Sequence, residues 1–71
     1  MPGRARYEIV VRGCLSPRLA RLLDGFEPRT PSPGRTHFVG WVQDQSALHG
    51  ALRRLADFGF ELVSVTAYPP D

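Results

Sequence analysis

Two segments of the chain repeat one pattern, and this repeat limits the possible folds more than any other feature. LSPRLARLLDGFE (residues 15–27) and QSALHGALRRLADFGFE (residues 45–61) both carry leucines at helical spacing, followed by glycine, phenylalanine and glutamate. Leucines that recur every three or four residues mark the buried face of a helix, and glycine accepts the left-handed backbone that ends one. We therefore expect one helix in each half of the chain.

The residues that begin and end these helices can also be predicted. Ser16 can cap free backbone amides, and Pro17 suits the first helical position, so the first helix should begin there and end at Gly25. Asp44 is the candidate cap of the second helix, which Gly59 should close.

Four segments have strand character. The apolar and β-branched runs are YEIVVRG (residues 7–13), RTHFVGWV (35–42) and ELVSVTAY (61–68), the last stopped by PPD (69–71). FEPRT (26–30) predicts a short strand at a sheet edge, because Pro28 has no backbone N–H to donate to a neighbouring strand.

The order strand, helix, strand, strand, helix, strand predicts an α+β fold. Its expected form is a ferredoxin-like βαββαβ sandwich, in which one antiparallel four-stranded sheet carries both helices on one face. All 71 residues should form a single domain. Because a chain of this length buries only about 60% of its unfolded surface, its core is marginal and we expect a homodimer.

The alternation along the strands assigns side chains to the two faces of the sheet. Tyr7, Ile9 and Val11 should face the helices, which leaves Trp41 of the third strand on the open face. A one-residue change of register would instead bury Trp41. The residues expected to form an interface on the open face are Val10, Arg12, His37, Val39, Trp41, Leu62 and Tyr68.

Composition argues against several classes of function. All nine basic residues are arginine, they are scattered among seven acidic residues, and the net charge is only +2, so nucleic acid is not an expected partner. His37 and His49 lack the spacing of metal ligands, and no phosphate-binding or hydrolase motif occurs. We expect neither enzymatic activity nor a cofactor or metal, no membrane span, and a cytoplasmic location.

Cys14 is the only cysteine, and the sequence leaves its role open. A thiol near the start of a helix can have a lowered pKa and act as a nucleophile, but neither histidine lies near it in the sequence. The alternatives are a packed or loop cysteine and a residue in the wall of a ligand pocket.

The segment DQSALHGALRRLADFGFELVSV (residues 44–65) resembles the signature segment of the ACT domain family, and VRGCLSPRLARLL (11–23) is a weaker echo of it. The resemblance implies a homodimeric regulatory module that binds an amino-acid-like ligand or a protein partner. It places the ligand at the loop after the first strand, at Gly13, Cys14, Leu15 and Ser16.

A second resemblance gives the alternative function. RTHFVGWV (residues 35–42) is similar to the third strand of the RRM, which presents aromatic side chains for stacking on RNA bases. The alternative is therefore single-stranded RNA binding through the open face of the sheet.

Overall fold

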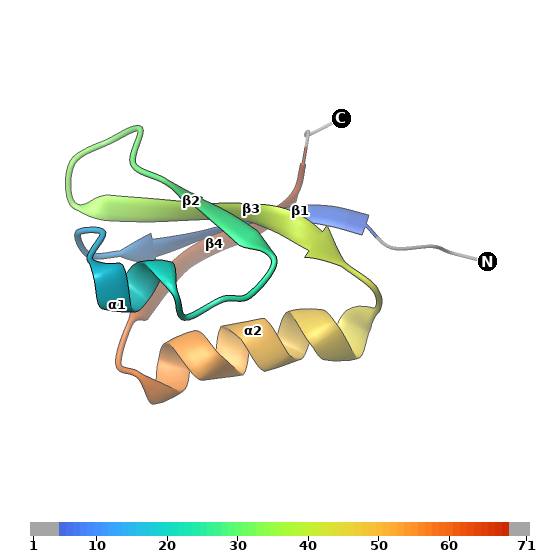
Figure 1. Ribbon diagram of the computed structural model, residues 1–71. Coiled ribbons are helices and arrows are strands. Elements are labelled where there is room, and N and C mark those ends of the chain that lie inside the picture. The colour runs from blue at the N-terminus through green and yellow to red at the C-terminus, as the bar shows by residue number, and fades with distance from the viewer. Residues whose placement is uncertain (1–4, 69–71) are drawn as a thin grey trace.

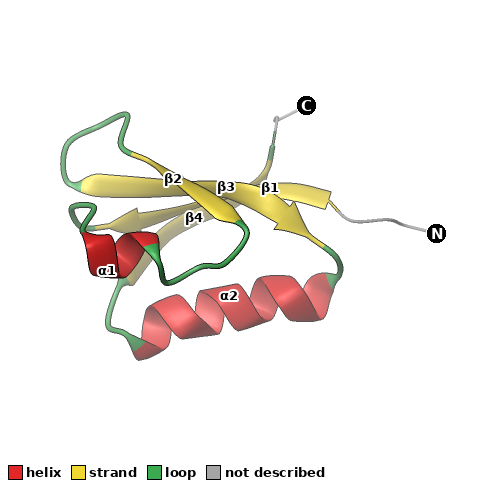
Figure 2. Ribbon diagram, viewed as in Figure 1, coloured by secondary structure: helices red, strands yellow, loops and turns green. Residues whose placement is uncertain are grey.

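The computed structural model describes residues 5–68, which form one four-stranded antiparallel sheet and two helices (Figure 1). The expected α+β class is thus confirmed. The elements are β1 (Ala5–Arg12), α1 (Pro17–Ala20), β2 (Phe26–Arg29), β3 (Arg35–Val42), α2 (Gln45–Asp57) and β4 (Glu61–Ala67). The strands are ordered β2-β3-β1-β4, and both helices lie on the same side of the sheet (Figure 2). The PPD segment expected to stop the last strand lies outside the described residues.

Strand β1 lies in the middle of the sheet and fixes which residues form the core. Its register with β3 places Ile9 opposite Phe38 and Tyr7 opposite Gly40, and directly opposite residues share a face of the sheet. Ile9 and Phe38 are fully buried with the helix leucines, so the predicted face assignment of β1 and β3 is confirmed. The buried cluster consists of Ile9, Val11, Leu19, Leu22, Leu23, Phe38, Val42, Leu48 and Leu55.

Helix α2 follows the sequence prediction closely. The Asp44 side chain accepts a 2.8 Å hydrogen bond from the backbone N–H of Ala47, as an N-cap should. Leu48 and Leu55 are buried against the sheet, and Gly59 ends the helix with a φ of 85°.

Helix α1 is much shorter than predicted. The Ser16 hydroxyl caps it by accepting a hydrogen bond from Leu19 N–H at 3.1 Å, but the helix ends after Ala20 instead of continuing to Gly25. Leu22 and Leu23 are nevertheless buried in the core. The spacing of these leucines therefore reflects burial in the core and not a continued helix. The prediction that α1 ends at Gly25 was wrong.

Gly40 allows the chain to pass closely over the sheet on its way into β2. A β-carbon built on Gly40 would lie 2.6 Å from the Gly25 carbonyl oxygen and 2.8 Å from the Phe26 ring. The absence of a side chain at Gly40 therefore lets Phe26 lie directly on β3, on the side of the sheet that carries the helices.

Strand β4 contains an irregularity that changes its predicted faces. Ile9 pairs with Val65, but Val11 pairs with Leu62, so Val63 is the extra residue of a bulge. Because Val11 faces the helices, Leu62 lies on the helix side and not on the open face, where the alternation had placed it.

Candidate functional site

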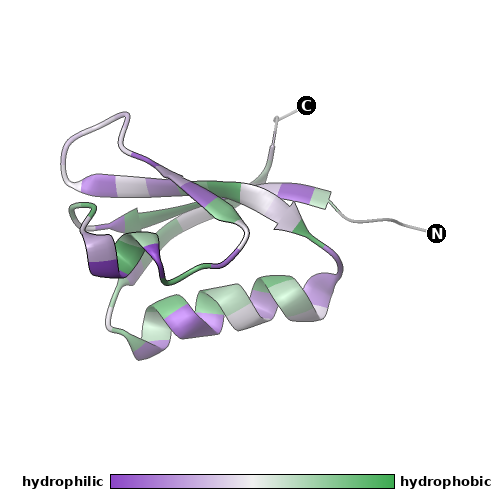
Figure 3. Cartoon of the chain, viewed as in Figure 1, coloured by the Kyte–Doolittle hydropathy of each residue, from purple (hydrophilic) through white to green (hydrophobic). Residues whose placement is uncertain are grey.

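The face of the sheet opposite the helices has no helix over it in the described part of the chain (Figure 1). Hydrophilic and hydrophobic residues are interleaved along its strands (Figure 3). This open face holds Trp41, as the sequence predicts, because Trp41 pairs with Arg6 on β1 and the alternation places both away from the core.

Trp41, Arg6 and Tyr68 form a cluster at one end of the open face, which we name the Trp41 corner. The Arg6 guanidinium carbon lies 5.7 Å from the centre of the Trp41 ring and 5.0 Å from the centre of the Tyr68 ring. These distances are typical of cation–π contacts. The Trp41 side chain remains 52% exposed. The corner thus presents a large aromatic surface that its own neighbours hold in place.

The backbone and the buried part of Arg6 tie this corner together. The Tyr68 N–H donates a 2.9 Å hydrogen bond to the Arg6 carbonyl oxygen, which extends the pairing of β1 with the segment after β4. Arg6 Nε is buried and has no hydrogen-bond partner among the described residues. Arg6 was not predicted as a site residue, although it shares its alternation with Glu8 and Arg12 and could have been found from that signal.

The middle of the open face is less apolar than the sequence suggests. Val10 and Val39 are only 6% and 3% exposed in the single chain. In the register, Val39 lies opposite Glu8 and Val10 opposite His37, and His37 Nδ1 lies 3.0 Å from Glu8 Oε2, at hydrogen-bond distance. The two valines are therefore largely buried already and contribute little exposed apolar area.

One ion pair lies near each edge of the sheet. On β2, Arg29 Nη2 donates a 3.0 Å hydrogen bond to Glu27 Oε1, and this carboxylate raises the pKa of the Arg29 guanidinium. Near the opposite edge, Arg12 Nε of β1 lies 3.7 Å from Glu61 Oε1 of β4, and both side chains are exposed. Exposed pairs of this kind contribute little to stability, but they neutralise much of the charge on this face.

The predicted ligand residues lie around a groove between two loops. Cys14 and Leu15 line a cavity of about 410 Å³ together with residues 30–35 of the β2–β3 loop. Gly13 holds the two loops together, since its N–H donates to the Gly34 carbonyl at 2.8 Å and its carbonyl accepts from the Thr36 hydroxyl at 3.0 Å. Ser16 caps α1. Cys14 and Leu15 therefore line the groove, whereas Gly13 and Ser16 make the backbone and capping contacts that hold this loop in place.

Cys14 is an exposed free thiol in this groove. Neither histidine lines the cavity. His37 is instead engaged with Glu8 on the open face. The structure therefore brings no histidine to Cys14 that could act as a base.

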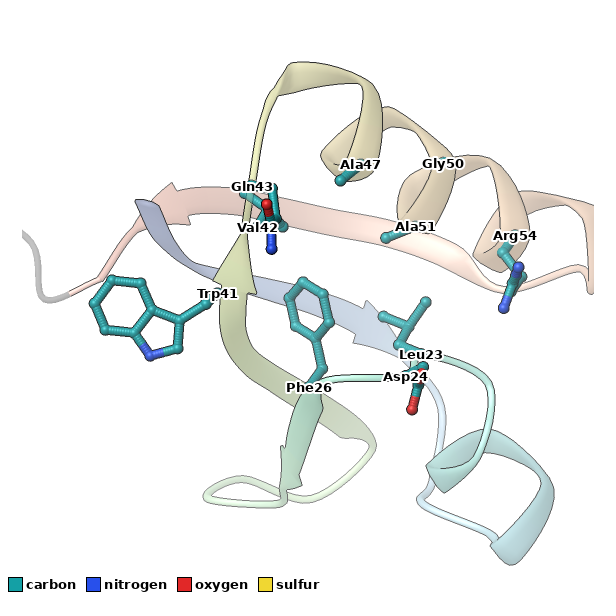
Figure 4. Close-up of a pocket in the computed structure, with 10 residues that line it drawn as sticks. All are labelled: Leu23, Asp24, Phe26, Trp41, Val42, Gln43, Ala47, Gly50, Ala51 and Arg54. Carbon is teal, nitrogen blue, oxygen red and sulfur yellow. The ribbon is translucent and has the colours of Figure 1, made fainter. Parts of the chain in front are cut away.

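A second cavity, which the sequence does not predict, lies beside α2 (Figure 4). It encloses about 310 Å³, and it lies between α2, the end of β3 and the start of β2. Phe26 points toward α2 in this view and Trp41 points away from it (Figure 4). At the far end the Arg54 side chain reaches the Leu22 carbonyl oxygen at 3.5 Å. Leu23 and Asp24, which follow the early end of α1, form part of its wall.

Within residues 5–68 no group of three or more histidine, cysteine or acidic side chains is placed to hold a metal ion. None of the helices in this part of the chain is long and apolar enough to cross a membrane.

Comparison with known proteins identifies a family. A model of the family described as "Domain of unknown function (DUF8691)" matches residues 6–66. No curated protein and no solved structure matches the chain. The chain belongs to this family, whose model spans the sheet and both helices.

Proposed function

We propose that this protein is a non-enzymatic binding module that works as a homodimer and holds a protein partner at the Trp41 corner. We assign it a ferredoxin-like arrangement, because its strand order β2-β3-β1-β4 joins two halves that each contain a strand, a helix and a strand. With both helices on one face, the opposite face is free to act as a binding surface.

The observation that carries the proposal is the exposure of Trp41. Trp41 is 52% exposed on a sheet face that no helix covers in the described part of the chain, so it offers a large aromatic surface to a partner. Tryptophan is also the residue type most enriched among those that dominate binding energy. Because Arg6 and Tyr68 already restrict the ring, a partner would lose little rotational freedom by binding it.

Photo-crosslinking tests the corner as a binding site. A photoreactive phenylalanine analogue placed at position 41 of the full chain should form a discrete product of higher mass in cells. The control carries the same analogue at position 58, because Phe58 is 48% exposed but lies at the end of α2. Equal products at the two positions, or none at position 41, would contradict the assignment of the corner.

The homodimer is supported by the small size of the domain. A core built from 71 residues leaves little stability in reserve, and a second subunit adds stability by mass action. Light scattering on the purified full chain should give twice the monomer mass of 7.9 kDa. A monomer mass at all concentrations would refute this part of the proposal.

A small amino-acid-like ligand is a second candidate for the module. It is favoured by the finding that Cys14 and Leu15 line a groove between two loops. Binding there should slow the reaction of the exposed Cys14 thiol with a colorimetric disulfide reagent. A panel of free amino acids that leaves this rate unchanged would remove the groove from consideration.

RNA binding is the alternative from another class. The Trp41 corner favours it, because an exposed aromatic ring beside an arginine can stack on a base. The acids on the same face weigh against it, since Glu8 and Glu27 engage His37 and Arg29. Quenching of Trp41 fluorescence by a single-stranded oligonucleotide at moderate salt would favour RNA over a protein partner.

A cytoplasmic location belongs to the same proposal. The support is the exposed free thiol of Cys14, which persists unmodified in a reducing compartment.

A further inference from the structure

The groove between the β1–α1 loop and the β2–β3 loop already has a fixed shape. This loop groove is lined by Cys14, Leu15 and residues 30–35. The Gly13 N–H donates to the Gly34 carbonyl at 2.8 Å, and the Thr36 hydroxyl donates to the Gly13 carbonyl at 3.0 Å. Because these hydrogen bonds already join the two loops, a ligand would lose little affinity by ordering them.

The lining of the loop groove is positively charged and rich in hydrogen-bond donors. Arg35 belongs to it, and none of the described residues that line the groove is acidic. Thr30 and Ser32 also line it, and neither hydroxyl has a hydrogen-bond partner within residues 5–68. Guanidinium and hydroxyl groups donate hydrogen bonds that an anion accepts. The lining therefore suits an anionic ligand.

Arg35 has no acidic partner in the described part of the chain. In the register of β1 with β3 it lies directly opposite Arg12, so two like charges face each other. Glu61 lies 3.7 Å from Arg12, and Glu27 pairs with Arg29 on the neighbouring strand, but Arg35 forms no ion pair within residues 5–68. Like charges in directly opposite positions destabilise a sheet. An anion bound at Arg35 would remove this repulsion.

We infer that the loop groove binds the carboxylate of a small organic ligand, and that Arg35 holds this carboxylate. The groove is the one proposed above for an amino-acid-like ligand, so this inference rests on that proposal. Arg35 supplies one positive charge that no described residue neutralises, which matches a carboxylate better than a phosphate with nearly two negative charges. The described lining offers no acid to an ammonium group, so the ligand is recognised through its carboxylate.

The thiol of Cys14 can report on the charge of Arg35, because it is exposed and lines the same groove. Two methanethiosulfonate reagents, one ending in sulfonate and one in trimethylammonium, modify a thiol by the same reaction but carry opposite charges. Both react with the same thiolate, so the ratio of their rates cancels any change in thiol ionisation. At low ionic strength, Arg35 should favour the sulfonate reagent.

Three variants of the full chain test this effect. Arg35→Gln should lower the ratio of the sulfonate rate to the trimethylammonium rate at least about threefold, because it removes a charge beside the thiol. Arg35→Lys keeps the charge and should keep most of the ratio. Arg53→Gln makes the same change as Arg35→Gln at an exposed position of α2 that does not line the groove, and should leave the ratio unchanged. Circular dichroism should show that all three variants fold.

Protection of Cys14 tests the class of ligand. Propionate and propionamide have nearly the same shape, but only propionate carries a carboxylate. At constant ionic strength, propionate should slow the reaction of Cys14 with uncharged methyl methanethiosulfonate in the wild type and not in Arg35→Gln. Propionamide should have no effect in either chain, and inorganic phosphate should protect less than propionate.

The outcomes separate this inference from the proposal on which it rests. A ratio that falls in Arg35→Gln alone, together with protection by propionate that needs Arg35, supports the carboxylate site. A ratio that Arg35→Gln does not change, or protection by phosphate and not by propionate, overturns it. If free amino acids still slow the thiol reaction in that case, the groove remains their site. If propionate protects and no free amino acid does, the carboxylate site stands and the amino-acid-like ligand is wrong.

Discussion

At the scale of single residues, Gly40 decides how closely the chain can cross the sheet. A methyl group there would lie 2.6 Å from the Gly25 carbonyl oxygen, which is backbone and cannot rotate away. Gly40→Ala should therefore force Phe26 and the start of β2 to shift, at a cost of about 1–3 kcal/mol in the free energy of unfolding. Denaturant titration followed by circular dichroism measures this loss.

Gly50 provides the matched control for that substitution. It lies inside α2, and a β-carbon built on it meets no atom within 4 Å. Gly50→Ala should stabilise the protein by about 0.5–1 kcal/mol, because alanine favours the helix over the unfolded chain. Equal effects of the two substitutions would contradict the close approach at Gly40.

Cys14 gives a second prediction at this scale. Its thiol is exposed in the loop groove, so Cys14→Ser should change the free energy of unfolding by less than about 0.5 kcal/mol. The native protein should react with a thiol reagent as fast as the unfolded chain does. A protected thiol, or a large loss of stability, would show that Cys14 is packed.

At the scale of elements, the two helices depend on their caps to different degrees. Asp44 caps a helix of thirteen residues, whereas Ser16 caps one of four. Asp44→Ala should destabilise the protein by about 1 kcal/mol and lower the helical signal, because α2 supplies most of the helix. Ser16→Ala should cost a similar free energy with little change in that signal. The reverse pattern of circular dichroism would contradict the short α1.

The elements also show where sequence patterns stop being informative. Asp44 and Gly59 predicted both ends of α2, because caps are local interactions. The end of α1 could not be predicted from its leucines, since Leu22 and Leu23 are buried in a non-helical segment. The bulge at Val63 was likewise invisible, because strict alternation assigns faces only while two strands stay in register.

At the scale of the whole molecule, alternation predicted the open face and the place of Trp41 on it. It could not predict that Val10 and Val39 would be buried, because this depends on side chains from a neighbouring strand. Arg6 shares the alternation of Glu8 and Arg12 and could have been placed on the open face, but its contacts with Trp41 and Tyr68 could not be predicted. The cavity beside α2 was also missed, because part of its wall is the non-helical segment after α1.

These corrections change the expected assembly. The sequence placed an apolar interface on the open face, but its valines have little exposed area left. The exposed aromatic surface that remains on this face is the Trp41 corner, which we propose as the site of a partner protein. Trp41→Ala should leave the dimer mass unchanged, because the corner is proposed to bind a different protein and not the second subunit. A monomeric Trp41→Ala chain would instead place the subunit interface on the open face.

Amide hydrogen exchange of the full chain tests the proposed homodimer most directly. Amides that a second subunit covers exchange more slowly, so at least one segment should gain protection as the protein concentration rises. Exchange rates that stay the same at every concentration, in every segment, would contradict the account.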